Sequence, residues 1–354
     1  MIQMGSAYHY GSSHGSPPLR MKSPLSAALA LCATLVFAHG LGAQPVGLRT
    51  EPIALVSADD AHHAQYAPDA SAVLFTQGAF EGVYRWTRSG NVSTLTDLPG
   101  TGFGYLISAT GEHMVVRAAT REGLYRREQL LTISLSHASD EAPPQATPLV
   151  HPFERLTASP RWSSDGSNLL LQRDDDVYWM PTPGRAPSLG KAPTALATIG
   201  SNLVFVHEDD QTVIRVVGKG AFEGDLLNLV ISPDGQYVAF EELGGALWLG
   251  RISDRSLVDL VELGVGHRPA FDRTGSLLAF MRTTDDGYQI TSSGIWVTDL
   301  LGQEGPERAV WRAPYPLVDR PDRLEMNPHF SPTDDRLLFD ADGTVFEVAL
   351  EVTR

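Results

Sequence analysis

The sequence predicts an all-β protein built from a repeated four-stranded unit, and two observations lead to this expectation. Residues 229–250 form a small meander of three apolar strands joined by tight turns, and copies of this meander recur along the chain. In the Ser-Pro-Asp-Gly turn at residues 232–235, proline presets φ and glycine takes the left-handed conformation, so the chain reverses. A meander of this size cannot bury both faces alone and therefore requires neighbours of the same kind.

Each copy has an aromatic or bulky anchor residue before its turn and an apolar residue nine positions later. This spacing occurs at Tyr66/Phe75, Ile107/Val116, Trp162/Leu171, Leu196/Phe205, Ile231/Phe240, Phe271/Phe280 and Phe330/Phe339. The copies follow one another at intervals of about 44 residues, close to the ~40–45 residues of a four-stranded propeller blade. The sequence therefore predicts a seven-bladed β-propeller of four-stranded antiparallel blades, or six blades if the fourth copy merges with a neighbour.

The repeated segments also resemble a known family. SPDGQYVAF, WSSDGSNLLL, FDRTGSLLAF and HFSPTDDRLLF are similar to the TolB-type, WD40-like (PD40) β-propeller repeats. The resemblance covers nearly the whole chain after residue 50 and implies blades around a central channel, with ligands or partners bound at one face. TolB carries an α/β domain before its propeller, and residues 44–60 are too few for one. The resemblance implies architecture more than activity, because one fold hosts many functions.

The N-terminal region predicts export. A positive residue at Lys22 precedes an apolar run at residues 25–37 and a small-residue exit that ends at Ala43, which is the order of a secretory signal peptide. We therefore expect residues 1–20 to be a non-native or disordered extension, 21–43 the signal peptide and 44–354 a single propeller domain. A lipoprotein signal at Cys32 is the alternative, although Leu31 stands where a small residue is needed. The predicted location is periplasmic or extracellular.

The two ends of the chain predict how the ring closes. Residues 48–56 form an isolated strand before the first turn, and the last copy ends after its third strand. Unpaired sheet edges invite aggregation. We therefore expect the N-terminal strand to become the outer strand of the last blade.

Composition and motifs narrow the function. The formal net charge of −15 argues against binding to nucleic acid or anionic lipid. No metalloprotease, P-loop or dinucleotide-binding pattern occurs, and the one Gly-x-Ser-x-Gly match lies at residues 11–15, before the signal peptide. The sequence thus predicts no catalytic residue, no metal and no cofactor, and an enzyme is the less favoured possibility.

Polar residues just before the anchors are expected to gather at the mouth of the channel, because the innermost strand of each blade runs into the turn. These candidate ligand-binding residues are His63, Arg161, Asn228, His267, Arg268, Asn327 and His329. Oligogalacturonate lyases are propellers with similar repeats and axial histidines, which makes a metal or uronate site the alternative. The three histidines stand three, four and one positions before their anchors, so they need not share one depth in the channel.

We therefore expect a secreted or periplasmic, TolB-like β-propeller that acts as a non-catalytic protein- or ligand-binding module. Its expected partner is an envelope protein or peptide, with no nucleic acid and no integral membrane span after signal cleavage, and the protein is expected to be a monomer. The alternative is a metal-dependent lyase or hydrolase that acts on an acidic sugar at the central channel.

Overall fold

In the computed structural model the chain divides into Met1–Ala43 and Gln44–Arg354, and the described residues all belong to the second part. The described residues are 46–57, 60–108, 110–135, 143–149, 158–162, 168–173, 176–181, 195–199, 202–207, 213–217, 226–253, 256–304 and 308–352. The predicted extension (1–20) and signal peptide (21–43) lie outside them. Within the described ranges, no helix is long and apolar enough to cross a membrane.

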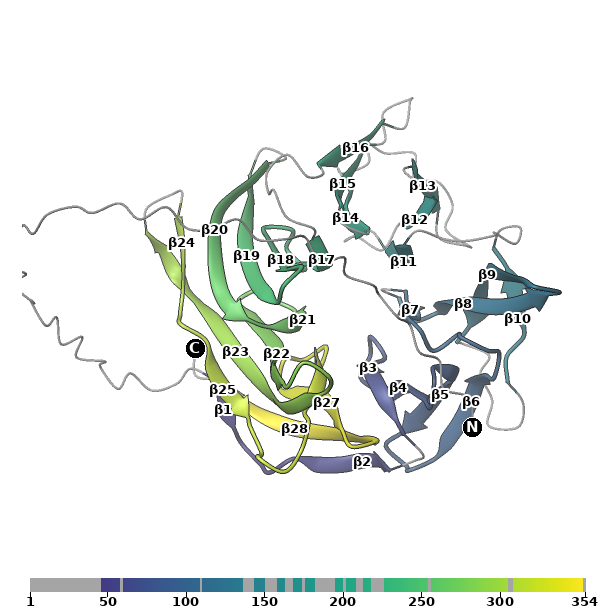
Figure 1. Cartoon of the computed structure of the whole chain (residues 1–354), viewed down its shortest axis with the longest axis horizontal. Coiled ribbons are helices and arrows are strands. Elements are labelled where there is room, and N and C mark those ends of the chain that lie inside the picture. The colour runs from purple at the N-terminus through teal and green to yellow at the C-terminus, as the bar shows by residue number, and fades with distance from the viewer. Residues whose placement is uncertain are drawn as a thin grey trace, which may run out of the picture. The chain divides into compact units, whose positions relative to one another are not determined.

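The described elements are β-strands that pair antiparallel within each sheet (Figure 1). The first sheet contains β3 (His62–Tyr66), β4 (Ala72–Gln77), β5 (Glu81–Thr87) and β6 (Val92–Thr96). The second contains β7 (Leu106–Ile107), β8 (His113–Glu122), β9 (Tyr125–Ser134) and β10 (Ala146–Pro148). Two shorter sheets follow. The third contains β11 (Ala158–Trp162), β12 (Asn168–Arg173) and β13 (Asp176–Pro181). The fourth contains β14 (Ala195–Ile199), β15 (Asn202–His207) and β16 (Val213–Val217).

The remaining three sheets make up the C-terminal half. One contains β17 (Leu226–Ile231), β18 (Tyr237–Glu242), β19 (Ala246–Ser253) and β20 (Ser256–Val265). The next contains β21 (His267–Phe271), β22 (Leu277–Asp285), β23 (Ile290–Glu304), β24 (Arg308–Trp311) and β25 (Tyr315–Val318). The last contains β26 (Met326–Phe330), β27 (Arg336–Ala341) and β28 (Thr344–Val352), joined by β1 (Val46–Leu48) and β2 (Ile53–Ser57).

The structure is all-β, but the predicted number of four-stranded blades is wrong. Five sheets have four antiparallel strands or more, whereas the sheets β11–β13 and β14–β16 have three strands each in the described ranges. Residues 182–194 and 218–225, which follow β13 and β16 in the sequence, lie outside the described residues. Within the described ranges the fold is therefore a β-propeller with five blades of at least four antiparallel strands, not the seven or six four-stranded blades that the repeat spacing predicts.

The expected pairing of the N-terminal segment with the last blade is confirmed, but the single strand predicted at residues 48–56 is two strands, β1 and β2, separated by residues 49–52. β1 pairs with the end of β28 in the register Val46↔Val352, and β2 pairs with its beginning in the register Ser57↔Thr344. Both N-terminal strands thus cover the free edge of β28. Val46 and Val56 are buried in this arrangement.

Among the described residues, four of the repeated turns are stabilised by the residue that follows the anchor. Its side-chain oxygen accepts the backbone N–H of the residue five positions later, which closes the turn before the return strand begins. The pairs are Ser108 with His113 (3.1 Å), Ser232 with Tyr237 (2.9 Å), Asp272 with Leu277 (2.9 Å) and Ser331 with Arg336 (3.2 Å). The chain therefore repeats this local hydrogen bond as well as its hydrophobic spacing.

The hydrophobic core lies between neighbouring sheets. Strands β4, β18, β22 and β27 are buried on both faces over most of their length, because each sheet packs against a sheet on either side. One cluster joins β26–β28 to β22, β23 and β25, and another joins β27 and β28 to β3 and β4. This packing brings the innermost strands β17, β21, β26 and β3 next to one another in that order around the middle of the domain (Figure 1).

Candidate functional site

A repeated bulge in the innermost strands turns four polar side chains toward the middle of the domain. In β3, β17, β21 and β26 the pairing register shifts at the same place, three positions before the anchor. The residue there has a positive φ in each strand: His63 (52°), Asn228 (47°), Arg268 (53°) and Asn327 (52°). Positive φ is uncommon outside glycine, and a bulge re-aims the side chain that it carries.

Two buried carboxylates hold these bulges in place. Glu241 Oε1 accepts the side-chain amide of Asn228 in its own sheet (2.7 Å) and the backbone N–H of Arg268 in the next sheet (2.7 Å). Asp340 repeats the pattern: its oxygens accept the side-chain amide of Asn327 (3.0 and 3.1 Å), and Oδ1 accepts the backbone N–H of His63 (3.0 Å). Each carboxylate therefore links an asparagine in one blade to the bulge of its neighbour.

The bulge of β3 has a further support. The buried Tyr105 hydroxyl donates to the backbone carbonyl of His63 (2.6 Å) or of Leu74 (2.8 Å). Burial raises the pKa of Tyr105, so the phenol stays protonated and remains a donor. This fixes the backbone beside His63.

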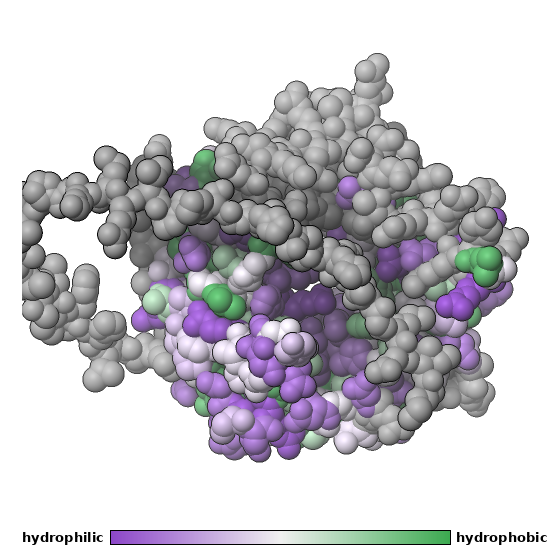
Figure 2. All heavy atoms as spheres, in the orientation of Figure 1, coloured by the Kyte–Doolittle hydropathy of each residue, from purple (hydrophilic) through white to green (hydrophobic). Residues whose placement is uncertain are grey.

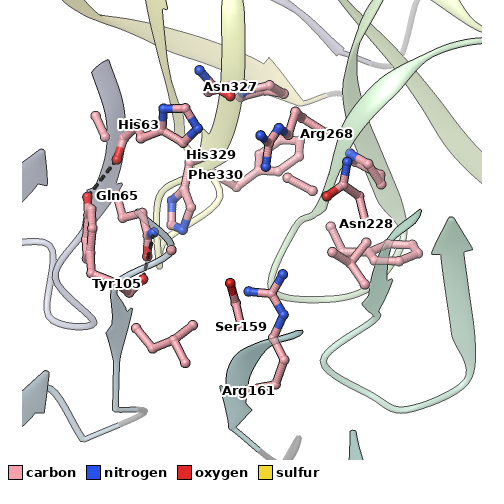
Figure 3. A pocket seen from close by; sticks show the side chains of 18 of the residues that line it. His63, Gln65, Tyr105, Ser159, Arg161, Asn228, Arg268, Asn327, His329 and Phe330 are labelled. Atoms are coloured by element: carbon pink, nitrogen blue, oxygen red, sulfur yellow. Dashed lines mark hydrogen bonds between the residues drawn. The ribbon is translucent and has the colours of Figure 1, made fainter. Parts of the chain in front are cut away.

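The bulges open into a cavity of about 520 Å³, within the range of ordinary ligand pockets (Figure 3). Its polar lining comes from five of the sheets and consists of His63, Gln65, Ser159, Arg161, Asn228, Arg268, Asn327 and His329. Phe103, Leu106, Phe271 and Phe330 add apolar surface. A second, smaller cavity shares Gln65, Phe271, His329 and Phe330 with the first, so the two adjoin along the same inner strands. Figure 2 shows a hollow with hydrophilic side chains on one face of the described surface.

The cavity is cationic although the chain as a whole is acidic. The guanidinium groups of Arg161 and Arg268 both point into it (Figure 3), and no aspartate or glutamate is among the described residues that line it. Neither guanidinium takes part in a hydrogen bond or ion pair with a described residue. Burial, and then the charge of Arg268, lower the pKa of Arg161. Burial raises the pKa of Asp340 behind the bulge and the charge of Arg268 lowers it, but among the described residues no carboxylate lines the cavity beside the two guanidinium groups.

The two cavity histidines are neutral near pH 7. Burial, with smaller contributions from Arg268 and His62, lowers the pKa of His63 to about 3. Burial also lowers the pKa of His329 to about 4. Nδ1 of each ring is buried and has no hydrogen-bond partner among the described residues. The imidazoles therefore add polarity to the cavity, while its positive charge comes from the two arginines.

Six of the seven predicted site residues line this cavity, and His267 is placed differently. His267 Nδ1 lies 3.0 Å from Glu241 Oε2, four positions before its anchor and outside the cavity lining. Among the described residues, no three histidine, cysteine, aspartate or glutamate side chains form a group that could hold a metal ion. His63, His267 and His329 therefore do not gather in the way that the metal alternative requires.

Sequence reasoning missed the residues that support the bulges, and Ser159 in the cavity wall. Glu241 and Asp340 carry a signal that could have identified them, because each stands ten positions after its anchor, Ile231 or Phe330. Tyr105 and Ser159 carry no such signal: Tyr105 stands in the short segment before β7, and Ser159 is one small residue in an irregular strand.

The fold is similar to solved β-propellers. The WD40 repeats of RRP9 superpose with a TM-score of 0.50 and 13% identity, covering 86% of this chain and 99% of that one. TolB from Acinetobacter baumannii gives a TM-score of 0.45 and 13% identity over 74% of this chain and 59% of TolB. An oligogalacturonate lyase in complex with manganese gives a TM-score of 0.45 and 13% identity over 84% and 79%. At these identities the likeness defines the class of protein, a β-propeller, and nothing narrower.

Sequence comparisons give no family. No family model matches the chain, and no curated protein matches it.

Proposed function

We propose that the protein is a TolB-like, non-catalytic binding module that takes a segment of a protein or peptide partner into the cavity. The observation that carries the proposal is the pairing of a polar cavity with exposed apolar side chains at the same edge of the sheets. In the export compartment that the signal peptide predicts, the partner is an envelope protein or peptide.

The apolar side chains stand on hairpin tips at the edge of the sheets where the inner strands begin. In an antiparallel pair, the beginning of one strand lies next to the end of the following strand, as in the pair Met326↔Asp340. The tips that follow β8, β18 and β22 therefore lie at the same edge as the bulges. These tips carry Leu124, Leu243 and Tyr288, which are largely or fully exposed.

Phe103 extends this apolar set to the cavity itself, because it is 42% exposed and lines the wall. We call Phe103, Leu124, Leu243 and Tyr288 the apolar rim. Exposed aromatic and aliphatic side chains at the same edge of the sheets as a polar recess fit a protein surface, in which apolar contacts supply area and the recess supplies specificity.

A pull-down from envelope extract with the exported protein tests the proposal. Leu124→Glu and Tyr288→Glu should each weaken capture of the partner, because they place a charge in the contact. Val92→Glu is the matched control, since Val92 is also exposed but begins β6 at the opposite edge of its sheet. Capture that survives both rim changes, or that falls equally with the control, would contradict the assignment of this edge as the binding face.

The second candidate function is a lyase or hydrolase that acts on an acidic sugar. One observation favours it: the two arginines in the cavity could bind a uronate carboxylate. Release of product from oligogalacturonate by the exported protein, lost in an Arg268→Gln variant, would establish this function in place of the binding module.

A further inference from the structure

The cavity concentrates positive charge in a protein that is otherwise acidic. Arg161 comes from β11 and Arg268 from β21, so two separate blades deliver one guanidinium each to the same space (Figure 3). With a formal net charge of −15 on the chain, carboxylates are available in quantity, yet none is found among the described residues that line the cavity. This separation of charge distinguishes the cavity from the rest of the protein.

The two carboxylates that support the bulges already accept hydrogen bonds from other groups. Glu241 accepts hydrogen bonds from Asn228, from His267 and from the backbone N–H of Arg268. Asp340 accepts from Asn327 and from the backbone N–H of His63. Both bind the backbone or amides of the bulges, so the guanidinium groups are left to face the cavity.

Two guanidinium groups in a partly buried space are unfavourable where no carboxylate is among the described residues that line it. Burial favours the neutral form of an ionisable group and like charges repel, and both effects lower the pKa of Arg161. Arginine does not lose its proton in proteins, so the unfavourable charge persists until an anion enters. A carboxylate between the two groups would relieve the repulsion and could accept hydrogen bonds from both.

We propose that the segment that enters the cavity is acidic, and that its carboxylate is bound between Arg161 and Arg268. This inference rests on the proposed function, because it names the chemistry of the partner segment. Ser159 stands beside Arg161 in Figure 3 and is placed to donate a neutral hydrogen bond to the same carboxylate. The neutral imidazoles of His63 and His329 line another part of the same cavity, where uncharged parts of the peptide would lie.

Peptide binding measured by fluorescence anisotropy tests the inference. Three labelled decapeptide pools are used. The acidic pool has aspartate or glutamate at two central positions and an amidated C-terminus, and the neutral amidated pool has asparagine or glutamine at those positions. The third pool has the same neutral side chains and a free C-terminal carboxylate. The wild-type protein should bind at least one carboxylate-bearing pool at least about tenfold more tightly than the neutral amidated pool. The comparison between the first and third pools separates an acidic side chain from a chain terminus as the source.

Single substitutions assign the preference to the two arginines. Arg161→Gln and Arg268→Gln should each reduce binding of the preferred carboxylate-bearing pool at least about tenfold and leave binding of the neutral amidated pool unchanged. Arg49→Gln removes the same charge from the exposed residue after β1, at the outer edge of its sheet, and should change neither. Thermal melting of all three variants confirms that they fold.

The outcomes separate this inference from the proposed function. Three results would overturn the inference that the bound segment is acidic. These are equal binding of the carboxylate-bearing pools and the neutral amidated pool, binding that neither cavity substitution affects, and no peptide binding at all. If the envelope pull-down still captures a partner in any of these cases, the binding module stands without it. If neither peptide nor envelope partner is bound, both proposals fail.

Discussion

The seam between the last and first sheets contains a buried hydrogen bond whose contribution to stability can be measured. The Tyr66 hydroxyl in β3 donates to Glu347 Oε1 in β28 (2.8 Å). Arg88 binds the same carboxylate through both terminal nitrogens, and Arg336 adds a third contact at 3.2 Å. These contacts fasten the end of the chain to the first blade, so a change here tests whether the seam is a strong or a weak point of the ring.

Tyr66→Phe removes one hydroxyl and little volume. Tyr66 is 3% exposed and its acceptor is charged, so the lost hydrogen bond should lower the free energy of unfolding by about 1.5–3 kcal/mol. That is a measurable part of the ~5–15 kcal/mol that typically stabilises a domain. Arg88 and Arg336 are 39% and 40% exposed, so water screens their ion pairs and each should contribute no more than about 1 kcal/mol.

Urea unfolding monitored by tryptophan fluorescence provides the measurement. Tyr288→Phe is the matched control, because it makes the same chemical change on a side chain that is 99% exposed, and it should alter stability by less than about 0.5 kcal/mol. A Tyr66→Phe protein as stable as the control would refute the reasoning. So would a double-mutant cycle with Glu347→Gln that gives a coupling energy near zero, since residues in direct contact typically couple by ~0.5–3 kcal/mol.

Two further predictions concern the ends of the ring and its buried acid. Deleting residues 44–57 removes β1 and β2, exposes the edge of β28 and loses the burial of Val46 and Val56. The deletion should lower the free energy of unfolding by about 3–6 kcal/mol and reduce solubility. An unchanged melting temperature would contradict ring closure by these strands. Asp340, with a pKa raised by burial to about 7, keeps its proton in the folded state over a range where the unfolded chain has lost it, so its contribution to stability declines from about pH 4 to pH 7. Relative to Asp340→Asn, the wild type should lose up to about 1.4 kcal/mol per pH unit in that range by urea unfolding, and a difference that does not vary with pH would contradict the raised pKa.

The turns and the N-terminal strand were predictable from sequence because local chemistry determines both. A serine or aspartate after the anchor, as at Ser232, binds the backbone within its own turn, and Gly235 takes the positive φ that the turn requires. The N-terminal strand was predictable because a ring of antiparallel blades leaves a free edge wherever the chain ends. Neither inference needs knowledge of distant contacts.

The number of four-stranded blades could not be predicted in the same way. Inner and middle strands are packed on both faces and carry dense apolar patterns, such as the fully buried centre of β18. An outermost strand has a free edge and a weaker pattern, so its presence is poorly marked in sequence. The repeat spacing counts turns, and a turn does not establish that a fourth strand follows.

The positions of the site residues were predictable, but their individual surroundings were not. Asn228, Arg268 and Asn327 stand three positions before their anchors, and the bulge directs all of them into the cavity. His267 stands one position earlier, before the bulge, and lies against Glu241 instead. A shift of one position thus changed the environment of the side chain, and no feature of the sequence marked the bulge itself.

The two carboxylates behind the bulges show how neighbouring residues give equivalent repeat positions different chemistry. Glu241 and Asp340 each bind an asparagine amide and a bulge N–H, so position in the repeat fixes their geometry. Burial raises the pKa of both, but at Glu241 the hydrogen bonds from His267, Arg268 and Asn228 outweigh it and lower the pKa. Asp340 has no imidazole partner, and its pKa rises to about 7. The fold therefore supplies a repeated slot, and burial together with the hydrogen-bond and charged neighbours of each acid sets its pKa.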